Sequence, residues 1–182
     1  MSNSKLPTIT VADIRGWGPC YDPTEYVAED WHGTALDVLR IDKCPAEDRL
    51  WVVLREKCIS TKILFLFAIW CTRRTLVWLG NIDLLSVNFC DIAEKFVNGG
   101  ATLEELNIVR EAVKTVSWFV INSTLKKASE IARRASRTAA GLASQAASGA
   151  SFCAPRDIAW EKEREAQAKH LIEMLEGVYE QA

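Results

Sequence analysis

The apolar run from Ile63 to Cys71 predicts a buried helix. It contains no polar residue, so a helix here is apolar on every face and has to be surrounded by other helices. The run is shorter than the roughly 20 apolar residues that a membrane span needs, and two arginines that follow interrupt any extension. Ser60 offers an N-cap and Gly80 a C-terminal stop. The sequence therefore predicts a central helix over about 60–79.

A second helix is predicted from Asp83 to Asn98, where two glycines end it. One stripe of this helix is formed by apolar residues at spacings of four, three and four: Leu85, Phe89, Ile92 and Phe96. We expect the last three of these to cover four almost fully buried residues of the central helix: Ile63, Phe67, Trp70 and Cys71.

A long alanine-rich helix is the next expectation. Thr102 and Glu105 match a capping box, in which each side chain satisfies a free backbone amide, so a helix begins at Leu103. Whether it breaks at 121–124 is open. Beyond that point, residues spaced by threes and fours form a seam where another helix can approach closely: Leu125, Ala128, Ala132, Ala135, Ala139, Leu142 and Ala146.

Shorter helices are predicted over Gly33–Arg40 and from Pro45, with an apolar face up to Cys58. A last helix starts near Pro155, with a buried side formed by four residues: Ala168, Leu171, Leu175 and Val178. No alternating strand pattern of useful length occurs. The chain therefore reads as one all-α domain over 1–182.

Residues 1–32 are predicted to form an irregular N-terminal arm on the helical bundle of residues 33–182. Two glycines and two prolines fall within ten positions of this arm, which prevents a helix there. We expect Trp17 and Trp31 to anchor the arm to the core. Its acidic residues resist burial and are expected to face solvent.

Composition limits the possible functions. The formal net charge of −2 gives no global field that favours nucleic acid or an acidic membrane surface. The first residues contain no apolar stretch typical of a signal peptide. The six cysteines include no Cys-x-x-Cys pair, so we interpret them as reduced, mostly buried thiols of a cytoplasmic protein.

Candidate catalytic chemistry is sparse. The two histidines, His32 and His170, accompany no nucleophile elbow, phosphate loop or zinc-protease motif. His170 and Glu173 lie one helical turn apart, but a metal site needs a second such pair. We therefore expect no enzyme activity, cofactor or metal, although a Cys–His pair assembled by the fold stays open as an alternative.

Charge is distributed unevenly along the chain. Residues 1–50 carry nine acidic and five basic residues, a balance of −4, and residues 110–140 carry seven basic and two acidic residues, a balance of +5. The acidic segment suggests a partner-binding surface with an aromatic centre: Tyr21, Asp22, Glu25, Glu29 and Asp30. The basic segment suggests an alternative face: Lys126, Lys127, Arg133, Arg134 and Arg137. A structural arm and a solvated helix face explain the same residues.

Five segments occur together in a recognisable order: Ile14–Pro23, Glu29–Ala35, Arg49–Arg55, Leu66–Cys71 and Asn98–Leu106. In this order they resemble the immunity protein 5-like family, immunity proteins of bacterial polymorphic toxin systems that also occur in phages. Typical members carry Ala-Cys-Asp-Cys-Ala-Glu in the core helix, where this chain has Ala68-Ile-Trp-Cys-Thr-Arg73, so no role of those acids carries over. The resemblance implies an all-α, non-enzymatic binding protein without assigned site residues.

The leading hypothesis is therefore a cytoplasmic protein that binds and neutralises a toxin through protein–protein contacts. The alternative is a nucleic-acid-associated or phage regulatory protein that uses the basic helix face, which the acidic pI of about 5.8 disfavours.

Overall fold

The computed structural model describes residues 6–79, 84–112, 127–148 and 154–179. Their fold class is all-α, as predicted. The helices are α1 (Val11–Gly16), α2 (Ala35–Leu39), α3 (Ala46–Val53), α4 (Thr61–Trp78), α5 (Leu84–Val97), α6 (Leu103–Ala112), α8 (Ala128–Ser148) and α9 (Ala154–Tyr179). A 3-10 turn, η1 (Pro23–Glu25), and two short strands, β1 (Ile9–Thr10) and β2 (His32–Gly33), lie in the N-terminal part.

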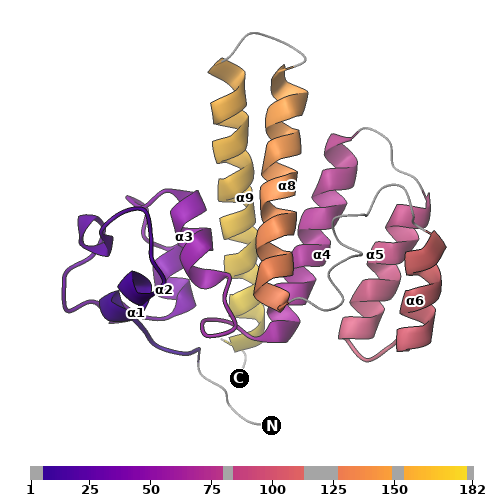
Figure 1. The fold of residues 1–182 in the computed structure, drawn as a ribbon, viewed down its shortest axis with the longest axis horizontal. Coiled ribbons are helices and arrows are strands. Elements are labelled where there is room, and N and C mark those ends of the chain that lie inside the picture. The colour runs from indigo at the N-terminus through magenta and orange to yellow at the C-terminus, as the bar shows by residue number, and fades with distance from the viewer. Residues whose placement is uncertain (1–5, 80–83, 113–126, 149–153, 180–182) are drawn as a thin grey trace.

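Three long helices, α4, α8 and α9, form the centre of the molecule (Figure 1). On one side, α2 and α3 pack against α9, and the N-terminal arm lies beyond them. On the other side, α5 packs on α4, and α6 packs on α5. Within the described ranges, no helix is long and apolar enough to cross a membrane.

The central helix is confirmed as α4. The Ser60 hydroxyl accepts a hydrogen bond from the Ile63 backbone N–H at 3.4 Å, which is the predicted N-cap. Ile63, Phe67 and Cys71 are buried in the main core. Trp70 is only half-buried, because it lies at the edge of the core and stacks on the His170 ring with centroids 4.2 Å apart.

The prediction that α5 covers the buried residues of α4 is wrong. Its main neighbour is α8 rather than α5, and Phe89 belongs to a separate, smaller cluster with Leu76 and Cys90. The buried stripe of α5 is also rotated from the expected one and consists of Ser86, Phe89, Cys90 and Ala93. Leu85 and Phe96 are exposed and Ile92 is half-buried. The physical reason is the shape of the surfaces: a helix that is apolar on all sides packs most closely on a neighbour with small side chains.

The alanine seam of α8 is confirmed over its first half. Ala128, Ala132, Ala135 and Ala139 are buried, and α8 packs on both α4 and α9 through this part. Farther along, Leu142 is half-buried and Ala146 is exposed. The reason is visible in Figure 1, where the ends of α8 and α9 extend past α4 and cover only each other. Leu125 and the open question of a break at 121–124 lie outside the described residues.

Enlarging Ala139 to Leu is expected to destabilise the protein by about 1–3 kcal/mol, because Ala139 is fully buried in the main core on a helix that packs on both α4 and α9. Ala146→Leu on the same helix is the control, since its side chain reaches solvent. Urea unfolding followed by circular dichroism measures both free energies of unfolding. Equal stability of the two variants would contradict the close packing of α8.

The N-terminal arm contains more regular structure than predicted. β1 pairs antiparallel with β2, with Ile9 opposite Gly33, and α1 follows β1 directly. The helix α1 forms because Thr10 and Asp13 make a capping box, a signal that the glycine and proline count obscured. From residue 17 to 31 the arm is irregular apart from η1, as predicted. Trp17 and Trp31 pack on the main core, so their anchoring role is confirmed.

The remaining helix boundaries follow their local signals. Gly99 adopts a φ of +78° at the end of α5, and the Thr102–Glu105 capping box begins α6. The helix α3 ends at Val53, short of the expected Cys58. On α9, three of the four predicted core residues, Ala168, Leu171 and Leu175, are buried. Val178, the fourth, is exposed because it lies in the last turn.

Candidate partner-binding surfaces

The five predicted partner-binding residues lie together on the N-terminal arm, and we call them the arm surface. Asp22, Glu25, Glu29 and Asp30 are exposed, as expected. Tyr21 differs from the expectation, because it is half-buried and packs edge-to-face on Tyr26 with ring centroids 5.4 Å apart. Burial, together with nearby acidic groups, raises the pKa of Tyr21, so its phenol stays neutral.

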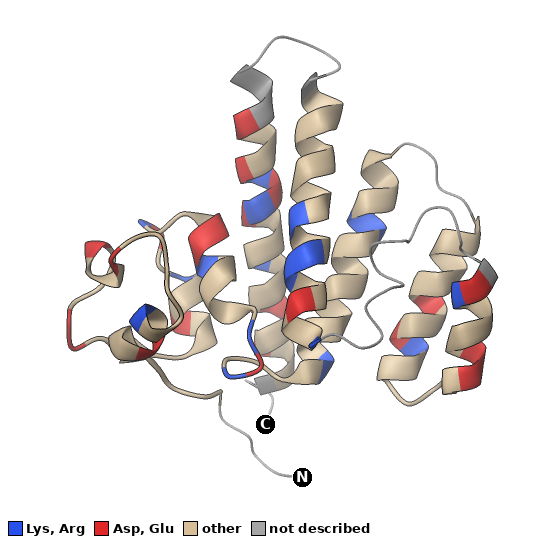
Figure 2. Ribbon diagram, viewed as in Figure 1, with Lys and Arg blue, Asp and Glu red and all other residues tan. Residues whose placement is uncertain are grey.

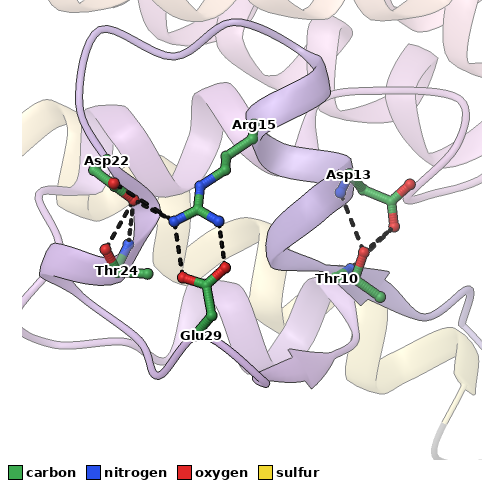
Figure 3. A network of polar contacts seen from close by, with 6 residues as sticks. All are labelled: Thr10, Asp13, Arg15, Asp22, Thr24 and Glu29. Atoms are coloured by element: carbon green, nitrogen blue, oxygen red, sulfur yellow. Dashed lines mark hydrogen bonds and ion pairs between the residues drawn. The ribbon is translucent and has the colours of Figure 1, made fainter.

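Arg15 holds the arm surface in one conformation (Figure 3). Its guanidinium donates to both carboxylate oxygens of Glu29, with one contact of 2.8 Å, and to Asp22 at 3.1 Å. Asp22 also accepts hydrogen bonds from the backbone N–H and the hydroxyl of Thr24, at 3.0 and 2.8 Å. The hydrogen bonds from Thr24 and Arg15 lower the pKa of Asp22, and those from Arg15 lower the pKa of Glu29. The clamp thus closes the loop between residues 15 and 29.

The Arg15 clamp changes which carboxylates a partner can use. Asp22 and Glu29 are already partly neutralised by Arg15, whereas no ion pair within the described residues engages Glu25 or Asp30. Arg15 carries one positive charge against two carboxylates, so the clamp keeps a net charge of −1, and the acids of the arm surface that lie outside it are Glu25 and Asp30. The sequence prediction treated all the acids alike and missed the clamp, because only the fold brings residue 15 to residue 29.

The alternative basic face lies along α8 and is visible as blue segments in Figure 2. An open hollow of about 400 Å³ is lined by its four described members: Lys127, Arg133, Arg134 and Arg137. Arg134 forms an ion pair with Glu130 at 3.1 Å, and the Arg133 Nε donates to the Ser129 carbonyl at 3.2 Å. Lys126, the fifth predicted residue, lies outside the described residues.

A buried polar network that the sequence prediction missed joins α9 to its neighbours. Four of its members are almost inaccessible to solvent: Ser136, Glu163, Arg164 and Gln167. The Gln167 amide donates to the Ser136 carbonyl at 3.0 Å and accepts from the Ser136 hydroxyl at 2.6 Å. Helical spacing could have indicated this, because residues 160, 164, 167, 171 and 175 follow one another by fours and threes into the core.

The described cysteines match the prediction of mostly buried thiols. Cys44, Cys58, Cys71 and Cys90 are buried free thiols, and Cys20 is exposed. Burial raises the pKa of Cys58 to about 12 and those of Cys44 and Cys90 to about 11. Such thiols are poor nucleophiles, because the reactive thiolate is scarce at neutral pH. Cys153 lies outside the described residues.

Each of the two histidines contacts neighbouring groups in the described part of the chain. His170 stacks on Trp70, and its Nδ1 lies 3.4 Å from Glu173, while burial lowers the pKa of His170. His32 is exposed, with Nδ1 3.3 Å from the Asp30 carbonyl oxygen. Among the described residues, no group of three or more His, Cys, Asp and Glu side chains could hold a metal ion.

Compared with protein families, with curated proteins and with solved structures, the chain has no match in any of the three. The resemblance to the immunity protein 5-like family therefore stays a prediction.

Proposed function

We propose that this protein is a cytoplasmic, immunity-type protein that binds and neutralises a basic toxin through its arm surface. The observation that carries the proposal concerns two carboxylates, Glu25 and Asp30, which no ion pair engages within the described residues and which lie on a loop that Arg15 clamps. The Tyr21–Tyr26 pair supplies an aromatic centre beside them. Aromatic residues ringed by charge are common in protein interfaces.

The clamp supports binding in two physical ways. A loop that is already ordered loses less conformational entropy when a partner binds, which strengthens affinity without additional contacts. Exposed carboxylates steer a basic partner toward the correct face and raise the association rate. Neither effect requires catalytic groups.

The direct experiment is co-purification with the product of a neighbouring gene, followed by a growth assay. We expect a toxic neighbour to bind this protein and to lose its toxicity when the two are co-expressed. If every adjacent gene product fails both to bind and to be neutralised, the immunity role is wrong.

Reversing Glu25 and Asp30 to Lys should slow association with the toxin and flatten its dependence on ionic strength, because it removes the free charge that steers the partner. Stopped-flow association rates between low and physiological salt measure this effect. The matched control reverses Asp157 and Glu161, exposed residues near the start of α9 and outside the arm. It changes the net charge equally, so equal slowing by both variants would contradict the assignment to the arm surface.

A second candidate function uses the basic face of α8 to contact nucleic-acid phosphates. It is favoured by Arg137, which no carboxylate engages among the described residues, and by its position one turn from Arg133. Phosphate contacts weaken steeply as salt rises. Retention on DNA or RNA at low ionic strength that is lost at physiological salt supports this function, and no retention at low salt excludes it.

A further inference from the structure

A pocket of about 170 Å³ lies between the arm, α3, α8 and α9. Its apolar lining is contributed by α3 and the residue that follows it: Leu50, Trp51 and Leu54. Its basic lining comes from Arg133 and Arg137 of α8 and Arg164 of α9. Cys20 of the arm completes the wall. The pocket is thus amphipathic, with an apolar side and an arginine-rich side.

Arg164 is a buried cation in this wall, with only 5% of its side chain exposed. It donates to the Ser136 hydroxyl and, at 3.2 Å, to the Gln167 carbonyl oxygen, while a further N–H reaches Glu47 at 3.3 Å. Among the described residues, its Nε has no hydrogen-bond partner. A buried donor without an acceptor is unfavourable, because its hydrogen bonds to water are lost on burial.

The arginines of the pocket outnumber its acids. Glu47 is engaged by Arg164 and by the Trp160 indole N–H at 3.1 Å, which leaves Asp48 as the second carboxylate in the lining. Burial raises the pKa of Asp48, and repulsion from Glu47 raises it further. Burial lowers the pKa of Arg164, and the nearby Arg137 lowers it further while Glu47 opposes both effects. Burial likewise lowers the pKa of Arg55, with a further contribution from Arg133. The local charge is therefore positive, and an anion would relieve the repulsion among the arginines.

Arg55 extends this positive region toward the arm. Its guanidinium lies between the rings of Trp17, 4.5 Å from the centroid, and Trp51, 4.3 Å from the centroid. The stacking fixes the cation in place beside a pocket wall that Trp51 also lines. The packing of the arm thus holds Arg55 beside the pocket, while Glu47 holds Arg164 within its wall.

We propose that this pocket binds a small organic oxyanion, a phosphate or carboxylate group carried on an apolar body. The planar guanidinium groups of Arg133 and Arg137 match the paired oxygens of either anion. The apolar body would lie against Trp51. The pocket volume of about 170 Å³ far exceeds the ~10–15 Å³ that one water requires, so it admits a group of several heavy atoms.

Titration calorimetry on the whole chain at low ionic strength tests the pocket with phenyl phosphate, benzoate, inorganic phosphate and neutral phenol. We expect phenyl phosphate or benzoate to bind more tightly than inorganic phosphate and phenol, because both walls are then used. Whichever of these two ligands binds more tightly shows whether the pocket prefers a phosphate or a carboxylate. Absence of heat with both aromatic anions would overturn the proposal, as would equal binding of phenol.

Matched variants locate the site. Arg137→Gln should weaken binding roughly tenfold or more, because a charge-assisted hydrogen bond is lost. Arg134→Gln, on the same helix but outside this pocket, should change affinity by less than about twofold, which is the scale of a screened surface charge. Both side chains are exposed, so neither change threatens folding. Equal weakening by the two variants would show diffuse attraction to α8 instead of a pocket.

Cys20 provides an independent readout. It is exposed and lines the pocket, so a bound ligand should slow its alkylation by iodoacetamide, measured on the Cys20 peptide by mass spectrometry. Protection should disappear in Arg137→Gln and persist in Arg134→Gln. Alkylation at the same rate with and without saturating ligand would place the anion elsewhere and overturn the assignment.

Discussion

Truncation of Phe67 to Ala is expected to lower the free energy of unfolding by about 3–5 kcal/mol. The ring is 0% exposed and lies in the main core, stacked near Trp70 with centroids 6.2 Å apart. Removing it leaves a cavity where α4 meets its neighbours. Collapse of that cavity is limited, because the buried side chains of α8 are mostly alanines, which are too short to fill it.

Phe96→Ala is the control for Phe67→Ala, since it removes the same atoms from a ring that is 37% exposed at the surface of α5. The loss of stability should be clearly smaller there, because much of that ring already contacts water. Chemical denaturation of both variants under the same conditions gives the two free energies. A Phe67 variant no less stable than the Phe96 variant would contradict the central position of α4.

The local parts of this fold could be predicted from sequence because their causes are local. The Ser60 cap and the Thr102–Glu105 capping box each involve residues three positions apart, so spacing alone identifies them. The apolar run of α4 likewise requires burial wherever the helix lies. Both signals act before any tertiary contact is known.

The choice of neighbours could not be predicted in the same way. A helix that is apolar on every side does not indicate which surface meets α8 and which meets α5. The alanine seam of α8 predicted that another helix packs closely on it, but not which helix. The partners of the buried polar network on α9 were missed for a related reason: its helical spacing is visible in the sequence, but the partner of Glu163 lies 89 positions away, on α4.

In the candidate site too, local features could be predicted from the sequence and features that depend on the fold could not. Solvent exposure of the acids on the arm follows from their charge, and Asp22, Glu25, Glu29 and Asp30 are exposed. The clamp by Arg15 depends on the fold of the arm, so the difference between paired and unpaired acids was invisible in the sequence. The pocket beside Arg164 arises from four separate elements and had no sequence signal of its own.

Arg74→Ala is expected to destabilise the protein by about 3–5 kcal/mol, because it leaves a buried carboxylate without its counter-ion. Arg74 contacts both oxygens of Glu163, with Nε 2.6 Å from Oε1, and only 1% of the Glu163 side chain is exposed. After truncation, two neutral donors remain: the Trp78 indole N–H at 3.3 Å and the Gln167 amide at 3.2 Å. Two neutral hydrogen bonds do not replace a bidentate charge-assisted pair.

Arg73→Ala is the matched control, because the adjacent arginine pairs with Asp91 and Glu94, whose carboxylates are exposed. Surface pairs of this kind contribute about 1 kcal/mol or less, so this variant should unfold close to the wild type. The double variant Arg74→Met/Glu163→Leu separates charge from packing: replacement of a buried pair by apolar residues is often neutral, so it should recover most of the stability that Arg74→Ala loses. If the double variant is as unstable as Arg74→Ala, the loss comes from the arginine's contact with Trp70, over which its guanidinium lies at 5.1 Å, and not from the stranded carboxylate.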